Sequence, residues 1–211
     1  MESEDLTQLL NQYLSEMTRI ALEYGATVDK YIGDAIMIFF GDPSTQGVTR
    51  DAQLCVEMGI AMQKRVAALH HEWQAAGHTK PFRIRIGIHT GFCTVGNFGT
   101  ESRMDYTIVG ANVNLASRIE SAAEPGSNTV TEDTWLLLKD RFPFVPTASV
   151  TPKGLSDPLQ LYRVVLEDER EHVVEFQQEG IRLMVDLKRA SVESRRQLLE
   201  KLHDLDEPPV A

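Results

Sequence analysis

A strand, a glycine turn and the start of a helix follow one another within residues 103–118, and no other stretch limits the possible folds of this chain as much. The aromatic and β-branched residues at 106–109 favour a strand. Gly110 interrupts that strand, and Asn112 is a residue type that commonly caps a helix N-terminus. The sequence therefore predicts a strand that turns sharply into a helix.

Two pairs of polar residues lie at or near predicted turns. Asn114 and Arg118 are four residues apart, so they share one face of the predicted helix, where a guanidinium can match phosphate oxygens. Lys30 and Asp34 lie around a predicted tight turn that begins at Gly33. A cation suited to phosphate and a carboxylate suited to a metal ion thus occur in separate motifs, which indicates nucleotide chemistry.

Each of these residues also has an ordinary structural interpretation. A lysine and an aspartate beside a hairpin turn are commonly solvated turn residues. An arginine one helical turn after an asparagine is commonly surface decoration, and Thr107 is a usual β-branched strand residue. We interpret His89, in the sequence GIHT, as a structural residue rather than a catalytic base. Neither motif alone establishes a function.

Hydrophobic periodicity predicts both helices and strands along the chain. Helices are expected at 4–24, 48–76, 112–123, 132–139 and 191–205. Strands, besides the one at 106–109, are expected at 27–31, 35–40, 82–90, 92–97, 128–130, 145–151 and 160–166. Gly96 and Gly99 are expected to bracket a loop that ends at Arg103. Helices that alternate with hairpins indicate an α+β fold, in which helices cover a mostly antiparallel sheet.

Four ordered blocks of sequence resemble the class III nucleotidyl cyclases, and among them the catalytic domains of CyaB-type bacterial adenylate cyclases. The blocks read KYIGDAIM, RIGIHTG, DYTIVGANVNLASR and PKGL, and the resemblance covers residues 4–166. It implies the ferredoxin-like cyclase fold, which is related to the palm of nucleic-acid polymerases. It also implies an enzyme that converts ATP to 3′,5′-cyclic AMP and pyrophosphate.

The resemblance gives each site residue a role by its position in these blocks. Lys30 matches the residue that contacts the adenine ring, and Thr107 matches its partner. Guanylate cyclases carry Glu and Cys at these two positions, so the pair indicates ATP. Asn114 matches the residue that orients the ribose, and Arg118 matches the one that stabilises charge on the α-phosphate. Lys153 matches a lysine that holds the terminal phosphates.

The resemblance implies two divalent ions at each site, Mg²⁺ or Mn²⁺, and Asp34 matches the second of the two aspartates that bind them. The family's first aspartate comes from a strand before the first helix, in a motif like FSDIxGFT. Residues 1–211 do not contain this motif, and Asp5 is no substitute because it precedes a helix. We therefore expect a cyclase homology domain at 1–166 without its first strand, as a truncated fragment or a shortened domain, and a C-terminal extension at 167–211 that contains a strand and a helix.

Composition and charge limit the partners. The formal net charge is −10, unlike a nucleic-acid-binding domain with its basic face, so no nucleic-acid partner is expected. No apolar run is long enough to cross a bilayer and no signal peptide opens the chain. This segment is thus expected in the cytoplasm without membrane contact, and any membrane or sensor domain would belong to a longer parent chain. Cys55 and Cys93 are expected as buried free thiols.

The resemblance also implies a head-to-tail homodimer, in which one subunit supplies Asp34 and the other supplies the remaining site residues. Two other functions compete with a cyclase. A non-catalytic nucleotide-binding or dimerising regulatory domain is favoured by the missing aspartate and opposed by the retention of the other site residues. A cyclic-dinucleotide synthase or polymerase-like palm is less well supported, because no turn like GGDEF is present.

Overall fold

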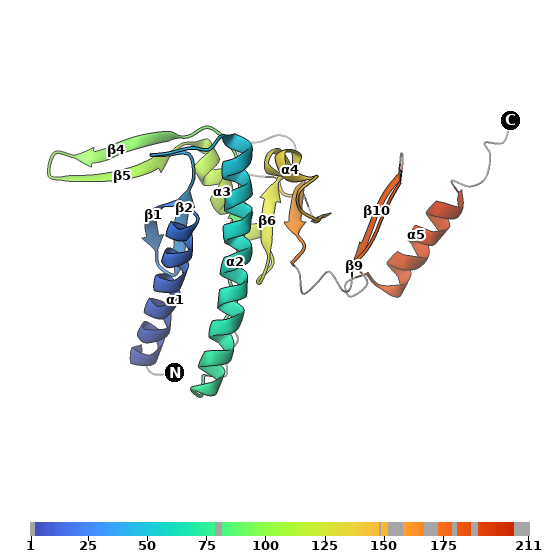
Figure 1. The fold of residues 1–211 in the computed structure, drawn as a ribbon, viewed down its shortest axis with the longest axis horizontal. Coiled ribbons are helices and arrows are strands. Elements are labelled where there is room, and N and C mark those ends of the chain that lie inside the picture. The colour runs from blue at the N-terminus through green and yellow to red at the C-terminus, as the bar shows by residue number, and fades with distance from the viewer. Residues whose placement is uncertain are drawn as a thin grey trace. The chain divides into compact units, whose positions relative to one another are not determined.

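The computed structural model describes residues 3–78, 82–147, 149–151, 158–166, 173–178, 181–186 and 190–204. The chain divides into two compact units, Met1–Val164 and Val165–Ala211. Figure 1 shows the elements of both units, and the residues discussed as a functional site all belong to the first.

The first unit alternates helices with strand pairs, which confirms the predicted α+β class. Its helices are α1 (Ser3–Glu23), α2 (Val48–Ala75), α3 (Ala111–Ala122) and α4 (Glu132–Leu138). Its strands are β1 (Thr27–Ile32), β2 (Ala35–Phe39), β3 (Ile86–Ile88), β4 (Thr94–Thr100), β5 (Arg103–Val109), β6 (Asn128–Thr131), β7 (Phe144–Pro146) and β8 (Leu161–Val164).

The strands of this unit form separate pieces of sheet. β3, β6, β8 and β7 make one sheet in that order, with β3 and β6 parallel and the other neighbours antiparallel. The pair β1 and β2 and the pair β4 and β5 are antiparallel hairpins. Among the described strands, β2 pairs only with β1 and β3 only with β6, so each of the two leaves one edge open.

Helix α2 is central to the hydrophobic core, because its apolar residues pack in two directions. Met62 belongs to a buried cluster that includes Met17 of α1. Val56 belongs to a second cluster, with Val130 of β6 and residues of α4, β7 and β8. Helices α1 and α2 run side by side (Figure 1), and an ion pair at 3.0 Å between Glu16 of α1 and Arg65 of α2 joins them. The core therefore holds α1, β3 and β6 against one long helix.

The loop predicted around Gly96 and Gly99 is wrong, because both glycines lie within β4, which pairs with β5 along its whole length. A Cβ atom at Gly99 would lie 2.1 Å from the carbonyl oxygen of Arg103, so a glycine is needed for the close approach of the two strands near the tip. Glycines in a polar stretch are typical of loops, whereas here the pairing partner makes the segment a strand. Figure 1 shows the hairpin as a long arm.

The prediction that both cysteines are buried holds in part for Cys55, which is half-buried, and is wrong for Cys93. Cys93 precedes β4 and is exposed, since the strand predicted from residue 92 begins only at Thr94. Cys55 of α2 packs against the core, and burial raises the pKa of its thiol to about 12. Both are free thiols.

Glycine at position 87 lets α3 lie directly on β3. A Cβ atom there would be 2.2 Å from the backbone nitrogen of Glu120 and 2.8 Å from the carbonyl oxygen of Ala116. We expect Gly87→Ala to lower the free energy of unfolding by about 3 kcal/mol or more, because backbone atoms cannot move aside as a flexible side chain can. Urea denaturation measures this. Gly96→Ala is the matched control, since its nearest neighbour would be at 3.8 Å; an equal loss in both variants would contradict the expectation.

The second unit contains an antiparallel hairpin of β9 (Val173–Gln178) and β10 (Ile181–Asp186), followed by α5 (Val192–Asp204). The Ser191 hydroxyl accepts a hydrogen bond from the Ser194 backbone N–H at 3.0 Å, which caps the N-terminus of α5. Across the described ranges, no helix has both the length and the apolar character that crossing a bilayer requires.

Candidate functional site

A buried aspartate lies beside one of the predicted site residues. Asp29 lies at a bulge in β1, because the register with β2 shifts between Val28 and Lys30. Neighbouring residues of a regular strand point to opposite faces, and a bulge interrupts this alternation. Lys30 Nζ lies 3.5 Å from Asp29 Oδ2, although the Lys30 side chain is 44% exposed and the Asp29 side chain is fully buried at 0%.

Thr107 approaches the same carboxylate from β5. Its hydroxyl donates a hydrogen bond to Asp29 Oδ2 at 2.9 Å, and Thr107 is itself only 5% exposed. The other carboxylate oxygen, Asp29 Oδ1, has no hydrogen-bond partner among the described residues. Two residues predicted to act together, Lys30 and Thr107, are thus brought together around one carboxylate.

Sequence reasoning did not find this role for Asp29. The only signal was an acidic residue directly before Lys30, and the alternation of a regular strand places such a neighbour on the opposite face. The bulge in β1 and the contact with β5 become visible only in the folded chain.

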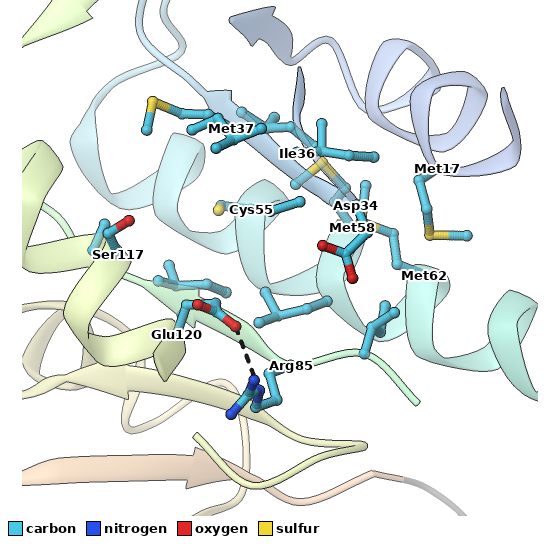
Figure 2. A pocket seen from close by; sticks show the side chains of 18 of the residues that line it. Met17, Asp34, Ile36, Met37, Cys55, Met58, Met62, Arg85, Ser117 and Glu120 are labelled. Atoms are coloured by element: carbon cyan, nitrogen blue, oxygen red, sulfur yellow. Dashed lines mark ion pairs between the residues drawn. The ribbon is translucent and has the colours of Figure 1, made fainter. Parts of the chain in front are cut away.

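A slot of about 460 Å³ lies between β2 and β3 (Figure 2). Its walls are largely apolar, with Ile36 from β2, Ile86 from β3, Met17 from α1, Met58 from α2 and Val113 from α3. Both strands that line it have an open edge within the described part of the chain. Backbone groups at an open edge need hydrogen-bond partners, so the slot has the shape and the chemistry to receive an extended segment.

Asp34 is exposed at the turn between β1 and β2 and lines this slot (Figure 2). Tyr13 of α1 lines it too, and burial, followed by the negative charges of Asp34 and Glu120, raises the pKa of Tyr13 to about 12. Glu120 forms an ion pair with Arg85 at 3.4 Å. Of the predicted site residues that the structure describes, only Asp34 lines the slot.

The residues around Asp34 do not by themselves complete a metal site. Mg²⁺ and similar hard cations are held by several oxygen ligands. Among the residues described, no group of three or more His, Cys, Asp or Glu side chains is placed to hold an ion. Asp34 thus offers a single carboxylate, and a site for two ions requires further ligands.

Helix α3 begins after Gly110, and a network of side chains fixes its first turn. The prediction that Asn112 caps this helix is wrong, because its amide donates to the carbonyl oxygen of Phe92 at 2.7 Å and its Oδ1 lies 3.1 Å from Nε2 of His89. The other ring nitrogen of His89 lies 2.9 Å from the Thr131 hydroxyl. His89 therefore ties α3 to β6, which agrees with its interpretation as a structural residue.

Asn114 and Arg118 are both exposed and share one face of α3. The face of α3 that lines the slot is a different one, formed by Val113, Ala116, Ser117 and Glu120. A single chain therefore presents this pair in another direction from the slot that Asp34 lines. Lys153 falls within 152–157, outside the described residues.

Comparison with known proteins identifies similar domains. The family described as "Adenylate and Guanylate cyclase catalytic domain" matches residues 1–167. The crystal structure of the adenylyl cyclase CyaB from P. aeruginosa is 55% identical, with a TM-score of 0.76 over 78% of this chain and 84% of that one. The crystal structure of the guanylyl cyclase Cya2 is 34% identical, with a TM-score of 0.73 over 79% of this chain and 83% of that one.

Similar full-length proteins are longer than this chain. An adenylate cyclase of Anabaena cylindrica is 35% identical over 172 residues, which are 78% of this chain and 33% of that protein. Adenylate cyclase 1 of Rhizobium meliloti (strain 1021) is 29% identical over 164 residues, which are 77% of this chain and 24% of that protein. The chain thus spans a third or less of these two relatives.

Proposed function

Because the chain belongs to the family of adenylate and guanylate cyclase catalytic domains, we propose that residues 1–166 form an adenylate cyclase domain that converts ATP to 3′,5′-cyclic AMP and pyrophosphate. The observation that carries the choice of ATP is the meeting of Lys30 and Thr107 at the Asp29 carboxylate. A base is selected by the donors and acceptors that it must satisfy, because a buried polar group without a partner is unfavourable.

The reaction forms a bond from the 3′-oxygen of ATP to the α-phosphorus and breaks the bond from that phosphorus to pyrophosphate, while the 3′-hydroxyl loses its proton. In our proposal the Arg118 guanidinium donates hydrogen bonds to the α-phosphate oxygens, where negative charge develops. Asn114 orients the ribose, so that the 3′-oxygen lies in line with the bond that breaks. Lys153 holds the terminal phosphates.

We propose that the complete site forms between two copies of the chain in a head-to-tail homodimer. Asp34 and the pair Asn114 and Arg118 lie on different faces of one chain, and a second copy can bring them together. The β4–β5 arm is consistent with contact to a second copy, because the large apolar side chains of Met104 and Tyr106 are exposed on it.

Asp34 is the residue that would hold Mg²⁺ or Mn²⁺, which when bound would neutralise the phosphates. We propose that the missing carboxylate comes from an extended segment in the slot between β2 and β3. The open edges of both strands and the position of Asp34 in the slot support this. A strand that pairs with either edge would carry every second side chain toward the same face, and one of these can be an aspartate beside Asp34.

ATP is expected to be the better substrate. The full-length protein is given ATP and GTP with Mn²⁺, and both cyclic products are measured. We expect a higher kcat/KM for ATP, and we expect Lys30→Glu to weaken the use of ATP more than it weakens folding, because the Lys30 ammonium would contact the base. Lys64→Glu makes the same charge change on the exposed face of α2 and serves as the control. A higher kcat/KM for GTP in the unsubstituted protein would contradict the proposal.

A second candidate function is a nucleotide-binding or dimerising regulatory domain without catalysis. One observation favours it: among the described residues, no group of three or more His, Cys, Asp or Glu side chains is placed to hold a metal ion. The same assay separates the two functions. A full-length protein that binds ATP and releases no cyclic product would support the regulatory role.

A further inference from the structure

We propose that Asp29 is the positioning residue that makes this site select adenine, because it fixes the direction of the Thr107 hydroxyl proton. The inference rests on the proposed function and adds a residue and a mechanism to it. It starts from the fully buried carboxylate of Asp29, whose Oδ2 accepts the Thr107 hydrogen bond at 2.9 Å and lies 3.5 Å from Lys30 Nζ.

A threonine hydroxyl can donate one hydrogen bond and accept others. Its proton normally rotates to suit whichever partner arrives, so a free threonine distinguishes poorly between a donor and an acceptor. Among the described residues, the acceptors for the Thr107 proton are Asp29 Oδ2 at 2.9 Å and the Ile108 carbonyl oxygen at 3.4 Å. The shorter bond, to a carboxylate, is the stronger. With 5% of Thr107 exposed, little water competes for the proton.

A base edge that reaches Thr107 therefore meets lone pairs rather than a proton. Adenine carries an amino group at position 6, which donates, whereas guanine carries a carbonyl oxygen there, which accepts. The amino group of adenine can bond to the Thr107 oxygen, and the carbonyl oxygen of guanine meets another acceptor. Asp29 also lies next to the Lys30 ammonium, so one carboxylate orients both residues predicted to read the base.

The bulge in β1 is what makes this arrangement possible. Without the register shift between Val28 and Lys30, Asp29 and Lys30 would point to opposite faces of the strand. With it, the Lys30 ammonium stays close to the carboxylate that Thr107 contacts. Asp29 Oδ1 lacks a partner among the described residues, so the contacts of the carboxylate are concentrated on the oxygen that faces Thr107.

Asp29→Asn tests the inference, because an amide can donate to the Thr107 oxygen and release the hydroxyl proton toward the base. Binding of 3′-deoxy-ATP and 3′-deoxy-GTP, which lack the attacking hydroxyl, is measured by calorimetry with Mn²⁺ on the full-length protein. We expect the preference for the adenine nucleotide to fall about tenfold or more. If Asp29 had a purely structural role, the substitution would weaken the binding of both nucleotides alike and leave the ratio of their affinities unchanged.

A double-substitution cycle shows whether Asp29 acts through Thr107. In the Thr107→Val background no hydroxyl remains to be oriented, so adding Asp29→Asn should leave the ratio of the two affinities unchanged. Asp29→Ala is the second variant if Asp29→Asn does not fold, and it should also reduce the preference because the proton becomes free to rotate. Melting temperatures establish that each variant is folded.

The outcomes separate the inference from the proposed function. A preference for the adenine nucleotide that persists in folded Asp29→Asn and Asp29→Ala overturns the inference and leaves the proposed function standing. If the unsubstituted protein binds the two nucleotides equally, or binds neither, the result contradicts the inference and the proposed function together. A preference that falls in the single variants and not in the Thr107→Val background supports the inference.

Discussion

A carboxylate-bearing strand placed in the slot between β2 and β3 is expected to raise cyclase activity by more than about a hundredfold, since even the outer-shell partners of metal ligands typically contribute about 10–100-fold. Residues 1–211 alone are expected to bind divalent ions weakly and to show little or no activity. The reaction needs two carboxylates that share two metal ions, and Asp34 offers only one of them. Mg²⁺ gives up its hydration shell reluctantly and is held only by well-placed oxygen ligands.

The experiment compares residues 1–211 with the same chain extended at its N-terminus by a strand of the form FSDIxGFT. A third protein carries the extension with asparagine in place of the motif's aspartate, which separates the strand from its charge. Both extended proteins should melt at a higher temperature than residues 1–211, because the strand covers apolar surface and pairs open edges. Only the aspartate form should gain activity.

Equal activity in residues 1–211 and the extended chain would refute this account. It would mean that another carboxylate, such as Asp5 or Asp29, supplies the second metal ligand. The Asp29 side chain is fully buried and its Oδ2 is already engaged by Thr107, which argues against that residue.

Arg118→Ala is expected to lower kcat on the order of a hundredfold or more while KM changes little, the usual effect of removing a preorganised donor that acts in the transition state. Charge on the α-phosphate oxygens is greatest as the 3′-oxygen attacks, so a guanidinium contributes more there than in the bound substrate. The measurement is steady-state kinetics with ATP and Mn²⁺ on the active, extended chain.

Arg50→Ala is the matched control, since it removes one arginine whose side chain is 45% exposed and lies 3.9 Å from Glu57 in a surface pair. It should leave both kinetic constants nearly unchanged. An unchanged kcat in Arg118→Ala would remove Arg118 from the residues that act in the reaction.

Local sequence pattern was sufficient for most helices and for the turn at Gly33, because periodicity and turn chemistry act over short stretches. It predicted a strand at 92–97 but missed the second half of β4, where the exposed arm has no buried face to impose alternation and where pairing with β5 decides the structure. The prediction that Cys93 is buried in a strand also failed, because that residue lies just before the same exposed arm. These are positions whose structure depends on a partner strand rather than on their own residues.

The candidate site divides in the same way. The resemblance to the nucleotidyl cyclases was enough to pick out Lys30 and Thr107, and the structure places both at one carboxylate. Asp29 itself could not be assigned, because its role depends on a bulge and on a hydrogen bond to another hairpin. The slot could not be located either, since its walls come from segments that are distant in the sequence.

The separation of Asp34 from the Asn114 and Arg118 face has a consequence for how the output of such a domain scales. If each complete site needs two copies, dilute chains form almost no product. At low density, product formation then rises with the square of the local concentration of chains. Any neighbouring receptor, scaffold or array that crowds copies together then acts as a switch, without altering a single bond inside the domain.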